Sequence, residues 1–568
     1  MVSYFSTRGH KDPLSFEDVI LSGVAPDKGL YLPDSITLEN LTYLTQEDLS
    51  YEDFVKTIFI ALDKASASYV EGLSLYPGFE NSPEPTLIEV DNTTLVMELF
   101  HGPTKSFKDY ALQPLGAIAD KRLTELGERG LVIVATSGDT GSAAIEAVKD
   151  SENIDIVVLH PANKISEYQR KQMTSVIKDN VLNIAINGSY DDCQRLAKEL
   201  LQDNPFKRRI ISLNSINWLR VMGQVSYYVW LTKQFTSPIN VAIPSGNFGN
   251  AYSAWYGRSH GLPIKNILCS TNINDVLKRF IDTGVLEPKE THPSVAPSMD
   301  IQIPSSLERL IYDLSGDASG FYKSFGDNSK AELDEKSFKA LKHIFSSFTF
   351  NDDEIKNKIS DLYSEFEIIF DPHTATSVSM AVENSNNMTT VAVATASPEK
   401  FAQTITQSIK EYKEVEELLI EQKKHIKVFA EDNGQDLLAS GEVVLAQEFN
   451  GDVAQLMLED SDISYIVPNE GSIIWEDCLC IPKDAPNKEN AHKFIDYLLG
   501  AKTGADLADY IQYATPNKEA KDLMGLDYIK NPAIFPTDEI IKVCENQIYL
   551  GEEIGQVIQD SWTRILAS

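Results

Sequence analysis

Apolar runs that lead into glycine-rich turns are the feature that most limits how this chain can fold. Each of three segments joins such a run to a small-residue turn and an amphipathic stretch: GLVIVATSGDTGSAAIEAVKD (130–150), IDIVVLHPANKISEYQRKQM (154–173) and INVAIPSGNFGNAYSAWYG (239–257). Val and Ile runs without polar alternation are typical of strands buried on both faces. Strands that alternate with helices predict an α/β fold with parallel sheets and right-handed crossovers.

Length and charge limit the domain count and the partners. A chain of 568 residues is longer than one core usually organises, so more than one domain is expected. The formal net charge of -34 predicts a surface that repels nucleic acid and anionic lipid. No run is apolar enough for a membrane helix, and MVSYFSTRGHKDPLSFEDV lacks the pattern of a secretory signal, which predicts a cytoplasmic location. The five cysteines are scattered, and we expect neither a disulfide framework nor a bound metal.

Three loops carry residues suited to one kind of cofactor. In ELFHGPTKSFKDYAL (98–112), Lys108 stands between a phenylalanine and an aspartate, just past the expected end of a strand. The turns SGDTG (137–141) and SGNFGN (245–250) stand where helices begin, and free N–H groups at a helix start favour phosphate. Either turn alone could be only a tight connection with a good helix cap. A lysine beside two such turns suits pyridoxal phosphate, an aldehyde that bears a phosphate.

Nine segments extend this pattern over residues 1 to about 410. They are YFSTRGH (4–10), GVAPDKGLYLP (23–33), ELFHGPTKSFKD (98–109), ATSGDTGSAA (135–144), NSINWLR (214–220), PSGNFGN (244–250), PSMDIQIPSSLER (297–309), DPHTA (371–375) and ATASPEKF (394–401). In this order they resemble the threonine synthases of bacteria and fungi. The resemblance implies a fold-type II pyridoxal phosphate-dependent enzyme, with parallel sheets flanked by helices as in the tryptophan synthase β subunit.

The resemblance also implies roles for single residues. Lys108 resembles the Schiff-base lysine and general base, and Thr395 the hydroxyl residue that faces the pyridine nitrogen. Asp139 stands where many relatives place an asparagine against the phenolic oxygen of the cofactor. The cofactor phosphate would be bound by the backbone of Gly246, Asn247, Phe248, Gly249 and Asn250. The substrate would be bound by Ser137, Gly138 and Thr140, and its phosphate would be clamped by Asn214, Ser215 and Arg220.

The implied reaction converts O-phospho-L-homoserine and water to L-threonine and phosphate, the last step of threonine biosynthesis. Another lyase or dehydratase of the same fold is the nearest alternative. A dehydratase needs no site for a substrate phosphate, so the Asn214, Ser215 and Arg220 clamp argues against it. An arginine suits such a clamp because its planar guanidinium grips phosphate with paired hydrogen bonds.

From about residue 420 the chain resembles a second family. The segments LASGEVVLAQEFNGDVAQLM (438–457), YIVPNEGSIIWEDCLCIPKDAPNKENAHKFIDYLL (465–499), IQYATPNKEA (511–520) and NPAIFPTDE (531–539) are similar to the C-terminal half of spermidine/putrescine-binding proteins. The polyamine contacts implied are Trp475, Asp477, Tyr513 and Gln547. Because the N-terminal half of such a receptor is missing, we expect this lobe to have no activity of its own. The alternative is a polyamine-binding or polyamine-sensing fusion protein whose enzyme part is vestigial.

Four regions follow from the two resemblances. We expect an N-terminal threonine synthase domain at 1–85 and a catalytic domain at 86–410. A connecting helix at 411–425 would lead into the last region, at 426–568. That region is expected to form a partial α/β lobe of the periplasmic-binding-protein type.

Overall fold

The computed structural model describes residues 2–34, 49–136, 138–162, 165, 167–188, 190–203, 208–384, 388–430, 433–468, 471–475, 477–483, 485–546 and 552–568. The chain divides into two compact units. The first unit is Met1–Val415 with Gly551–Trp562, and the second is Glu416–Leu550 with Thr563–Ser568. Within these described ranges, no helix combines the length and the apolar character that crossing a bilayer requires.

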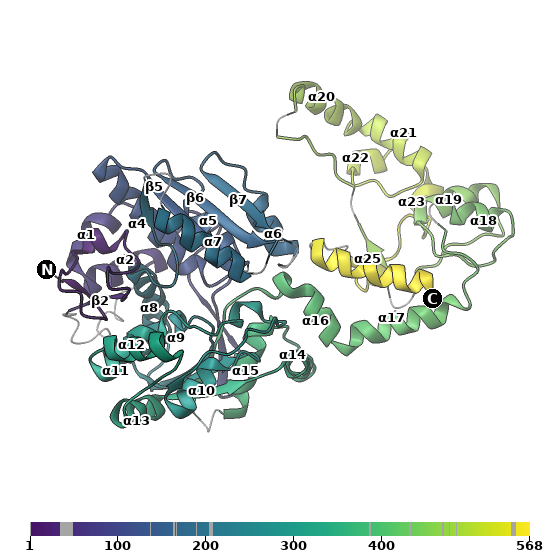
Figure 1. Ribbon diagram of the computed structural model, residues 1–568. Helices are drawn as coiled ribbons and strands as arrows, with labels where there is room; N and C mark the ends of the chain where they lie inside the picture. Colours follow the sequence, from purple (N-terminus) through teal and green to yellow (C-terminus); the bar gives the residue numbers. More distant parts are fainter. Residues whose placement is uncertain are drawn as a thin grey trace. The chain divides into compact units, whose positions relative to one another are not determined.

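Two sheets organise the first unit (Figure 1). The larger sheet has the order β13-β10-β9-β14-β4-β3, with only β3 antiparallel to its neighbour. The smaller has the order β7-β6-β5-β8 and is parallel throughout. The strands are β3 (Thr86–Glu89), β4 (Thr94–Glu98), β5 (Gly130–Ala135), β6 (Ile154–Pro161), β7 (Val181–Ile186), β8 (Arg209–Ile211), β9 (Ile239–Pro244), β10 (Ile264–Thr271), β13 (Phe345–Thr349) and β14 (Thr390–Ala394). The predicted α/β fold with parallel sheets is confirmed.

Strand burial explains the lack of polar alternation in the sequence. Every residue of β9 and of β14 is buried, and β5 is buried up to its last residue. Helices cover both faces of a parallel sheet, so a strand inside it needs apolar side chains on both sides. Two short antiparallel pairs complete the unit: β1 (Tyr4–Ser6) with β2 (Tyr31–Pro33), and β11 (Val285–Leu286) with β12 (Ala331–Glu332).

Helices connect and cover these strands. They are α1 (Phe16–Val19), α2 (Tyr51–Leu62), α3 (Ala67–Val70), α4 (Asp109–Leu126), α5 (Asp139–Val148), α6 (Glu167–Thr174), α7 (Tyr190–Asp203), α8 (Trp218–Lys233), α9 (Gly249–Ser259), α10 (Val276–Thr283), α11 (Leu307–Ser315), α12 (Ser319–Asn328), α13 (Glu335–Ile344), α14 (Asp352–Phe366), α15 (Pro372–Asn384) and α16 (Ala402–Ser408). Three 3₁₀ turns join them: η2 (Lys64–Ser66), η3 (Pro297–Met299) and η4 (Pro398–Phe401). The division between the two units falls within α17 (Lys410–Lys423).

The second unit is built of short helices around a small core. Its elements are α18 (Gly434–Ala439), α19 (Asn450–Glu459), α20 (Lys488–Leu498), α21 (Ala501–Ile511), α22 (Lys518–Lys521), α23 (Leu526–Ile529), α24 (Asp538–Ile541) and a parallel pair of β15 (Ile473–Ile474) with β16 (Glu545–Asn546); α25 (Glu552–Ala567) has residues in both units. Five residues form its buried cluster: Ala454, Ala508, Tyr528, Ala533 and Ile534. Large apolar side chains such as Val444 and Tyr510 are exposed.

A glycine sets the spacing of the two helices that begin at the predicted lysine and aspartate. Helix α4 starts directly after Lys108, and α5 starts at Asp139. At Gly116 in α4, an added Cβ would lie 2.4 Å from the backbone oxygen of Ala147, well inside van der Waals contact. The close approach of α4 and α5 therefore requires glycine at this position.

We predict that Gly116→Ala lowers the temperature at which the first unit unfolds, because the methyl group must push the α4 and α5 backbones apart. Overpacking of this kind costs about 1–3 kcal/mol. The matched control is Gly326→Ala in α12, where an added Cβ meets no atom within 4 Å. That change should be neutral or stabilising, since alanine favours helix over glycine. Calorimetry that finds equal shifts for both variants would contradict the packing argument.

Candidate active site

The carboxyl ends of three neighbouring parallel strands meet at one edge of the larger sheet. The chain after β4 leads to Lys108, and the chain after β9 forms the SGNFGN turn. Thr395 follows β14, which lies between those two strands. From the smaller sheet, the chain after β5 leads to Asp139, whose Oδ2 lies 3.4 Å from Lys108 Nζ. Ligands of open α/β sheets bind at such edges, so this is the candidate active site.

Lys108 has the environment of a reactive amine. Its side chain is only 11% exposed. Burial lowers the pKa of Lys108, Asp139 raises it in part, and the charges of Lys400 and Arg220 lower it again. A lysine acts as a nucleophile in its neutral form, and desolvation beside other cations favours that form.

The loop that carries Lys108 is fastened to the end of β14. The N–H of Phe107 donates to the carbonyl of Thr395 at 2.9 Å, and the N–H of Ser397 donates to the carbonyl of Lys105 at 3.1 Å. Thr395 itself is buried. The structure therefore places Thr395 beside the Lys108 loop, in the neighbourhood that its predicted role requires.

The SGDTG turn needs its glycine for conformation and for space. Gly138 has φ 142, and an added Cβ would lie 2.4 Å from the side chain of Gln169. The N–H groups of Gly138 and Gly141 donate to the Thr136 hydroxyl at 3.0 and 2.9 Å, which holds the turn closed. Thr140 is half-buried on the first turn of α5. The predicted substrate residue Ser137 lies outside the described residues.

The SGNFGN turn forms the start of α9. Phe248 adopts the left-handed conformation, with φ 68, directly before the first residue of the helix. At Gly246 an added Cβ would lie 2.4 Å from the backbone oxygen of Ser298, so no larger residue fits. Asn247 is exposed and accepts a hydrogen bond from the Ser305 hydroxyl at 3.3 Å. The first N–H groups of a helix have no partner within it, so this turn offers donors for an anion.

Asn250 lies deeper than its neighbours in the same turn. Its Oδ1 accepts hydrogen bonds from the hydroxyls of Tyr227 and Tyr228, at 2.7 and 2.6 Å. Its Nδ2 is buried without a hydrogen-bond partner among the described residues. The side chain therefore links α9 to α8, and a donor stays available at the base of the turn.

Among the predicted clamp residues, Ser215 lies beside Gly249 of the SGNFGN turn. Ser215 Oγ lies 2.8 Å from Ser305 Oγ, and an added Cβ on Gly249 would lie 3.8 Å from Ser215 Cβ. Buried Arg309 braces this loop by donating to the carbonyl of Ser215 at 3.3 Å. Asn214 is exposed and accepts from the Ser212 hydroxyl at 3.4 Å.

Arg220 is a buried cation without a counter-ion in the described part of the chain. It lies on the first turn of α8 and is 5% exposed, and its Nε has no hydrogen-bond partner there. Burial lowers the pKa of Arg220 to about 10. A buried charge without a counter-ion costs folding free energy. An anion that binds close to Lys108 would therefore be strongly favoured. The predicted clamp residue thus has the property that a phosphate site needs.

Three residues at this site were not predicted: Lys400, Gln169 and Ser298. All three contact the carboxylate of Asp139, at 2.7, 2.9 and 3.2 Å. Lys400 and Ser298 each lie within a segment that resembles threonine synthases, ATASPEKF and PSMDIQIPSSLER, but neither stood out within its segment. Gln169 comes from α6, outside those segments.

Three of the four predicted polyamine contacts in the second unit lie among the described residues: Trp475, Asp477 and Tyr513. Trp475 packs edge-to-face on Phe449 at 5.3 Å between ring centroids, and both rings are partly exposed. The Tyr513 hydroxyl donates instead to Asp452 in α19 at 3.2 Å. Asp477 is exposed, and Gln547 lies outside the described residues.

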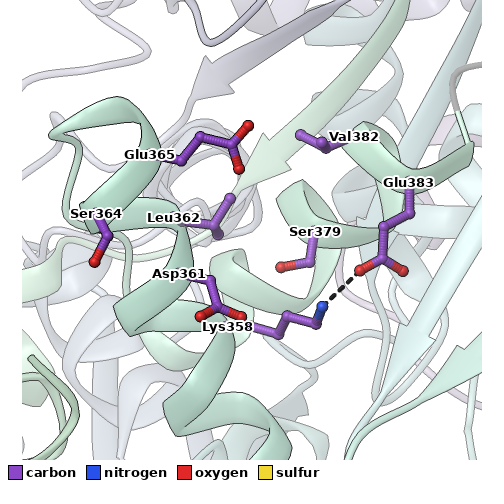
Figure 2. Close-up of a pocket in the computed structure, with 8 residues that line it drawn as sticks. All are labelled: Lys358, Asp361, Leu362, Ser364, Glu365, Ser379, Val382 and Glu383. Carbon is purple, nitrogen blue, oxygen red and sulfur yellow. Dashed lines mark hydrogen bonds and ion pairs between the residues drawn. The ribbon is translucent and has the colours of Figure 1, made fainter.

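A surface groove between α14 and α15 is separate from the lysine site. Figure 2 shows the side chains that line it, with the ion pair of Lys358 Nζ and Glu383 Oε1 at 2.6 Å. Its volume is about 440 Å³. The groove lies along the second half of α15, whereas Thr374 at the start of α15 accepts from the N–H of Thr395 at 3.2 Å. Among the described residues no group of His, Cys, Asp and Glu is arranged to hold a metal.

The residues present fit pyridoxal phosphate. Lys108 supplies an amine for the aldehyde, and the SGNFGN turn supplies N–H groups for the phosphate. The backbone at Gly246 packs so closely against the backbone of Ser298 that only glycine fits there. The unpaired donors at Asn250 and Arg220 add to the preference for an anionic molecule.

Comparisons with known proteins decide the family. A model described as pyridoxal-phosphate dependent enzyme matches residues 86–328, and one described as threonine synthase N terminus matches 3–63. The threonine synthase of Pseudomonas aeruginosa is 38% identical over 420 residues, which cover 71% of this chain and 89% of the relative. The chain belongs to the threonine synthase family.

Solved structures agree with this family. The pyridoxal phosphate-bound threonine synthase of Brucella melitensis has a TM-score of 0.67 and 35% identity, and the match covers 72% of this chain and 91% of that one. The yeast threonine synthase has a TM-score of 0.67 and 30% identity, with 72% and 89% covered. This threonine synthase family member is therefore a fold-type II enzyme whose cofactor is pyridoxal phosphate, as predicted.

The solute-receptor resemblance is also confirmed, with different limits. A model described as bacterial extracellular solute-binding protein matches residues 270–537. This range begins inside the enzyme match, and residues 270–415 belong to the first unit, whose larger sheet includes β13 and β14. Only the part beyond residue 415 lies outside the threonine synthase unit.

We predict that Lys108→Ala abolishes covalent capture of pyridoxal phosphate, because it removes the buried amine that reacts with the aldehyde. The measurement is the intact mass of the full chain after incubation with pyridoxal phosphate and reduction with borohydride. Lys105→Ala is the control, since that nearby lysine is more exposed and pairs with Glu399. A reduced cofactor adduct on Lys108→Ala would contradict the assignment.

Proposed function

We propose that the chain converts O-phospho-L-homoserine and water to L-threonine and phosphate. The observation that carries the proposal is Arg220, a buried guanidinium without a carboxylate partner in the described part of the chain, whose charge acts on Lys108. Relatives from Pseudomonas aeruginosa and Saccharomyces cerevisiae, each matched over 89% of its length, are named threonine synthase. A dehydratase of the same fold has no substrate phosphate for this arginine to bind.

We propose that separate loops of the first unit bind the cofactor and the substrate. The SGNFGN turn binds the cofactor phosphate through backbone N–H groups, and Thr395 faces the ring nitrogen. Ser215 and Arg220 hold the substrate phosphate, with Asn214 at the exposed end of the clamp. The bound cofactor supplies a conjugated ring that spreads the negative charge left when a proton is removed from the substrate.

Lys108 is the base in this scheme. With cofactor and substrate bound, its neutral amine would take the proton from the α-carbon, pass it on, and then take one from the β-carbon. The phosphate leaves the γ-carbon while Arg220 stabilises the charge that grows on it, and preorganised charge of this kind is often the largest contribution to catalysis. A proton then returns to the γ-carbon, the hydroxyl of a water adds at the β-carbon while its proton goes to the released phosphate, and a last proton returns to the α-carbon to give threonine. Burial of the site keeps other solvent away from the reacting atoms.

The cysteines support a cytoplasmic setting. Four are free thiols: Cys193, Cys269, Cys480 and Cys544. Free thiols persist in reducing compartments, and secreted proteins usually oxidise theirs. We therefore place the reaction in the cytoplasm, with the phosphorylated amino acid as its small-molecule partner.

We predict that Arg220→Met lowers kcat/KM for O-phospho-L-homoserine by about 100-fold or more, because it removes the charge that binds the leaving phosphate. Cofactor capture by Lys108 should persist. The measurements are phosphate release and threonine formation by the full chain. Arg258→Met, a partly exposed arginine on α9, should leave both unchanged. Unaltered turnover in Arg220→Met would contradict the role of Arg220 as the phosphate clamp, whereas an unmodified chain that forms no threonine would favour a dehydratase or another lyase.

The second unit is proposed to bind no polyamine by itself. Two of its implied contacts already have partners within the unit: the Tyr513 hydroxyl donates to Asp452, and Trp475 packs on Phe449 with both rings partly exposed. A small-molecule site needs several converging walls.

We predict no heat and no thermal shift when spermidine is titrated into the full chain up to millimolar concentration. The same titration into Trp475→Ala is the matched control. Saturable heat that Trp475→Ala removes would instead support a polyamine-sensing fusion protein.

A further inference from the structure

A second lysine is buried at the active site. Lys400 lies on η4, and its side chain has 0% exposure. Its Nζ lies 2.7 Å from Asp139 Oδ1 and donates to the carbonyl of Thr104 at 2.9 Å. It is thus closer to the carboxylate than Lys108, whose Nζ lies 3.4 Å from the other oxygen.

Every described contact of the Asp139 carboxylate is with a donor. Oδ1 accepts from the Lys400 ammonium and the Gln169 amide, and Oδ2 accepts from the Lys108 amine and the Ser298 hydroxyl. An ionised carboxylate has only acceptor sites, and this set of neighbours matches them. Burial alone would raise the pKa of Asp139, but the charges of Lys400 and then Lys108 outweigh it and hold the pKa well below its usual range.

The two lysines therefore share one carboxylate. If Asp139 were paired with Lys108 alone, it would stabilise the ammonium form of Lys108, which cannot attack an aldehyde. Lys400 acts against this in two ways. It engages Asp139 at the shorter distance, and its own positive charge disfavours a second ammonium nearby.

We propose that Lys400 is a positioning residue that neutralises Asp139, so that the pair acts as one uncharged unit and leaves Lys108 free to become a neutral amine. The proposal rests on the proposed role of Lys108 as the cofactor lysine. It also explains how a carboxylate is accommodated where many relatives place a neutral asparagine. The Asp139–Lys400 pair has no net charge, as an asparagine has none.

The groups that face Lys108 set the direction of the test. They are Asp139 on α5, Lys400 on η4 and Arg220 on α8. Removal of Lys400 alone takes away one neighbouring cation and frees Asp139, so the pKa of Lys108 should rise. Removal of both partners leaves the local net charge unchanged, so the pKa should return towards its original value.

The experiment measures the pH dependence of covalent pyridoxal phosphate capture by the cofactor-free full chain, using borohydride reduction and intact mass. For Lys400→Gln we expect the midpoint to move up by at least one pH unit, about a tenfold slower capture at a fixed pH below it. The double variant Asp139→Asn with Lys400→Gln should return the midpoint to within half a unit of the original. Lys105→Gln is the control for loss of a lysine near the site, and it should leave the midpoint unchanged.

Thermal unfolding of the same cofactor-free proteins gives a second readout. Lys400→Gln and Asp139→Asn each leave one buried charge without its main partner. Each of these two single variants should therefore unfold at a lower temperature than the double variant. If Lys400→Gln does not fold, the double variant still has to show the original midpoint.

Two outcomes overturn the proposal. One is an unchanged midpoint in folded Lys400→Gln, which would mean that Lys400 only supports the fold. The other is a double variant that captures cofactor no better than Lys400→Gln. Neither readout uses O-phospho-L-homoserine, so a wrong substrate assignment would leave these results intact and would appear only when the unmodified full chain is assayed for turnover of that substrate.

Discussion

The hydrogen bonds of β14 with its two neighbours are the constraint on which the rest of the site depends. Strand β14 pairs in parallel with β4 on one side and with β9 on the other. That pairing brings the loop of Lys108, the SGNFGN turn before α9 and Thr395 to one edge of the sheet. The backbone bond from Phe107 to Thr395 then fixes the height of the lysine loop above the sheet. Side chains are arranged on this frame, and they do not create it.

Charge is distributed very unevenly in this molecule. The chain as a whole carries a formal net charge of -34, yet the strongest charges acting on Lys108 are two cations, Lys400 and Arg220, and one carboxylate, Asp139. A buried cluster with excess positive charge is unstable without anions. The phosphates of the cofactor and the proposed substrate would supply them, so the protein should gain stability from the molecules on which it acts.

Much of the fold followed from local sequence patterns. The segments 130–150, 154–173 and 239–257 each contain the strand and the helix that their apolar runs and glycines predict. Lys108 was found because a lysine between an aromatic residue and an aspartate at a strand end has no surface role. The contacts of Asp139 could not be found in this way, because Lys400 and Gln169 come from segments far apart in the chain. Only the tertiary structure brings them to one carboxylate.

The position of β14 in the sheet has a consequence for how the chain is made. Strand β14 begins at Thr390, yet it occupies the middle of the larger sheet, between β9 and β4. Until the ribosome has released this segment, β4 and β9 each present an unpaired edge, which is prone to wrong pairing. Thr395 and Lys400 follow at once, so sheet closure and completion of the active site occur in the same step of synthesis. The second unit emerges while that step is under way, and the nascent enzyme folds with a partly apolar neighbour still attached to the ribosome.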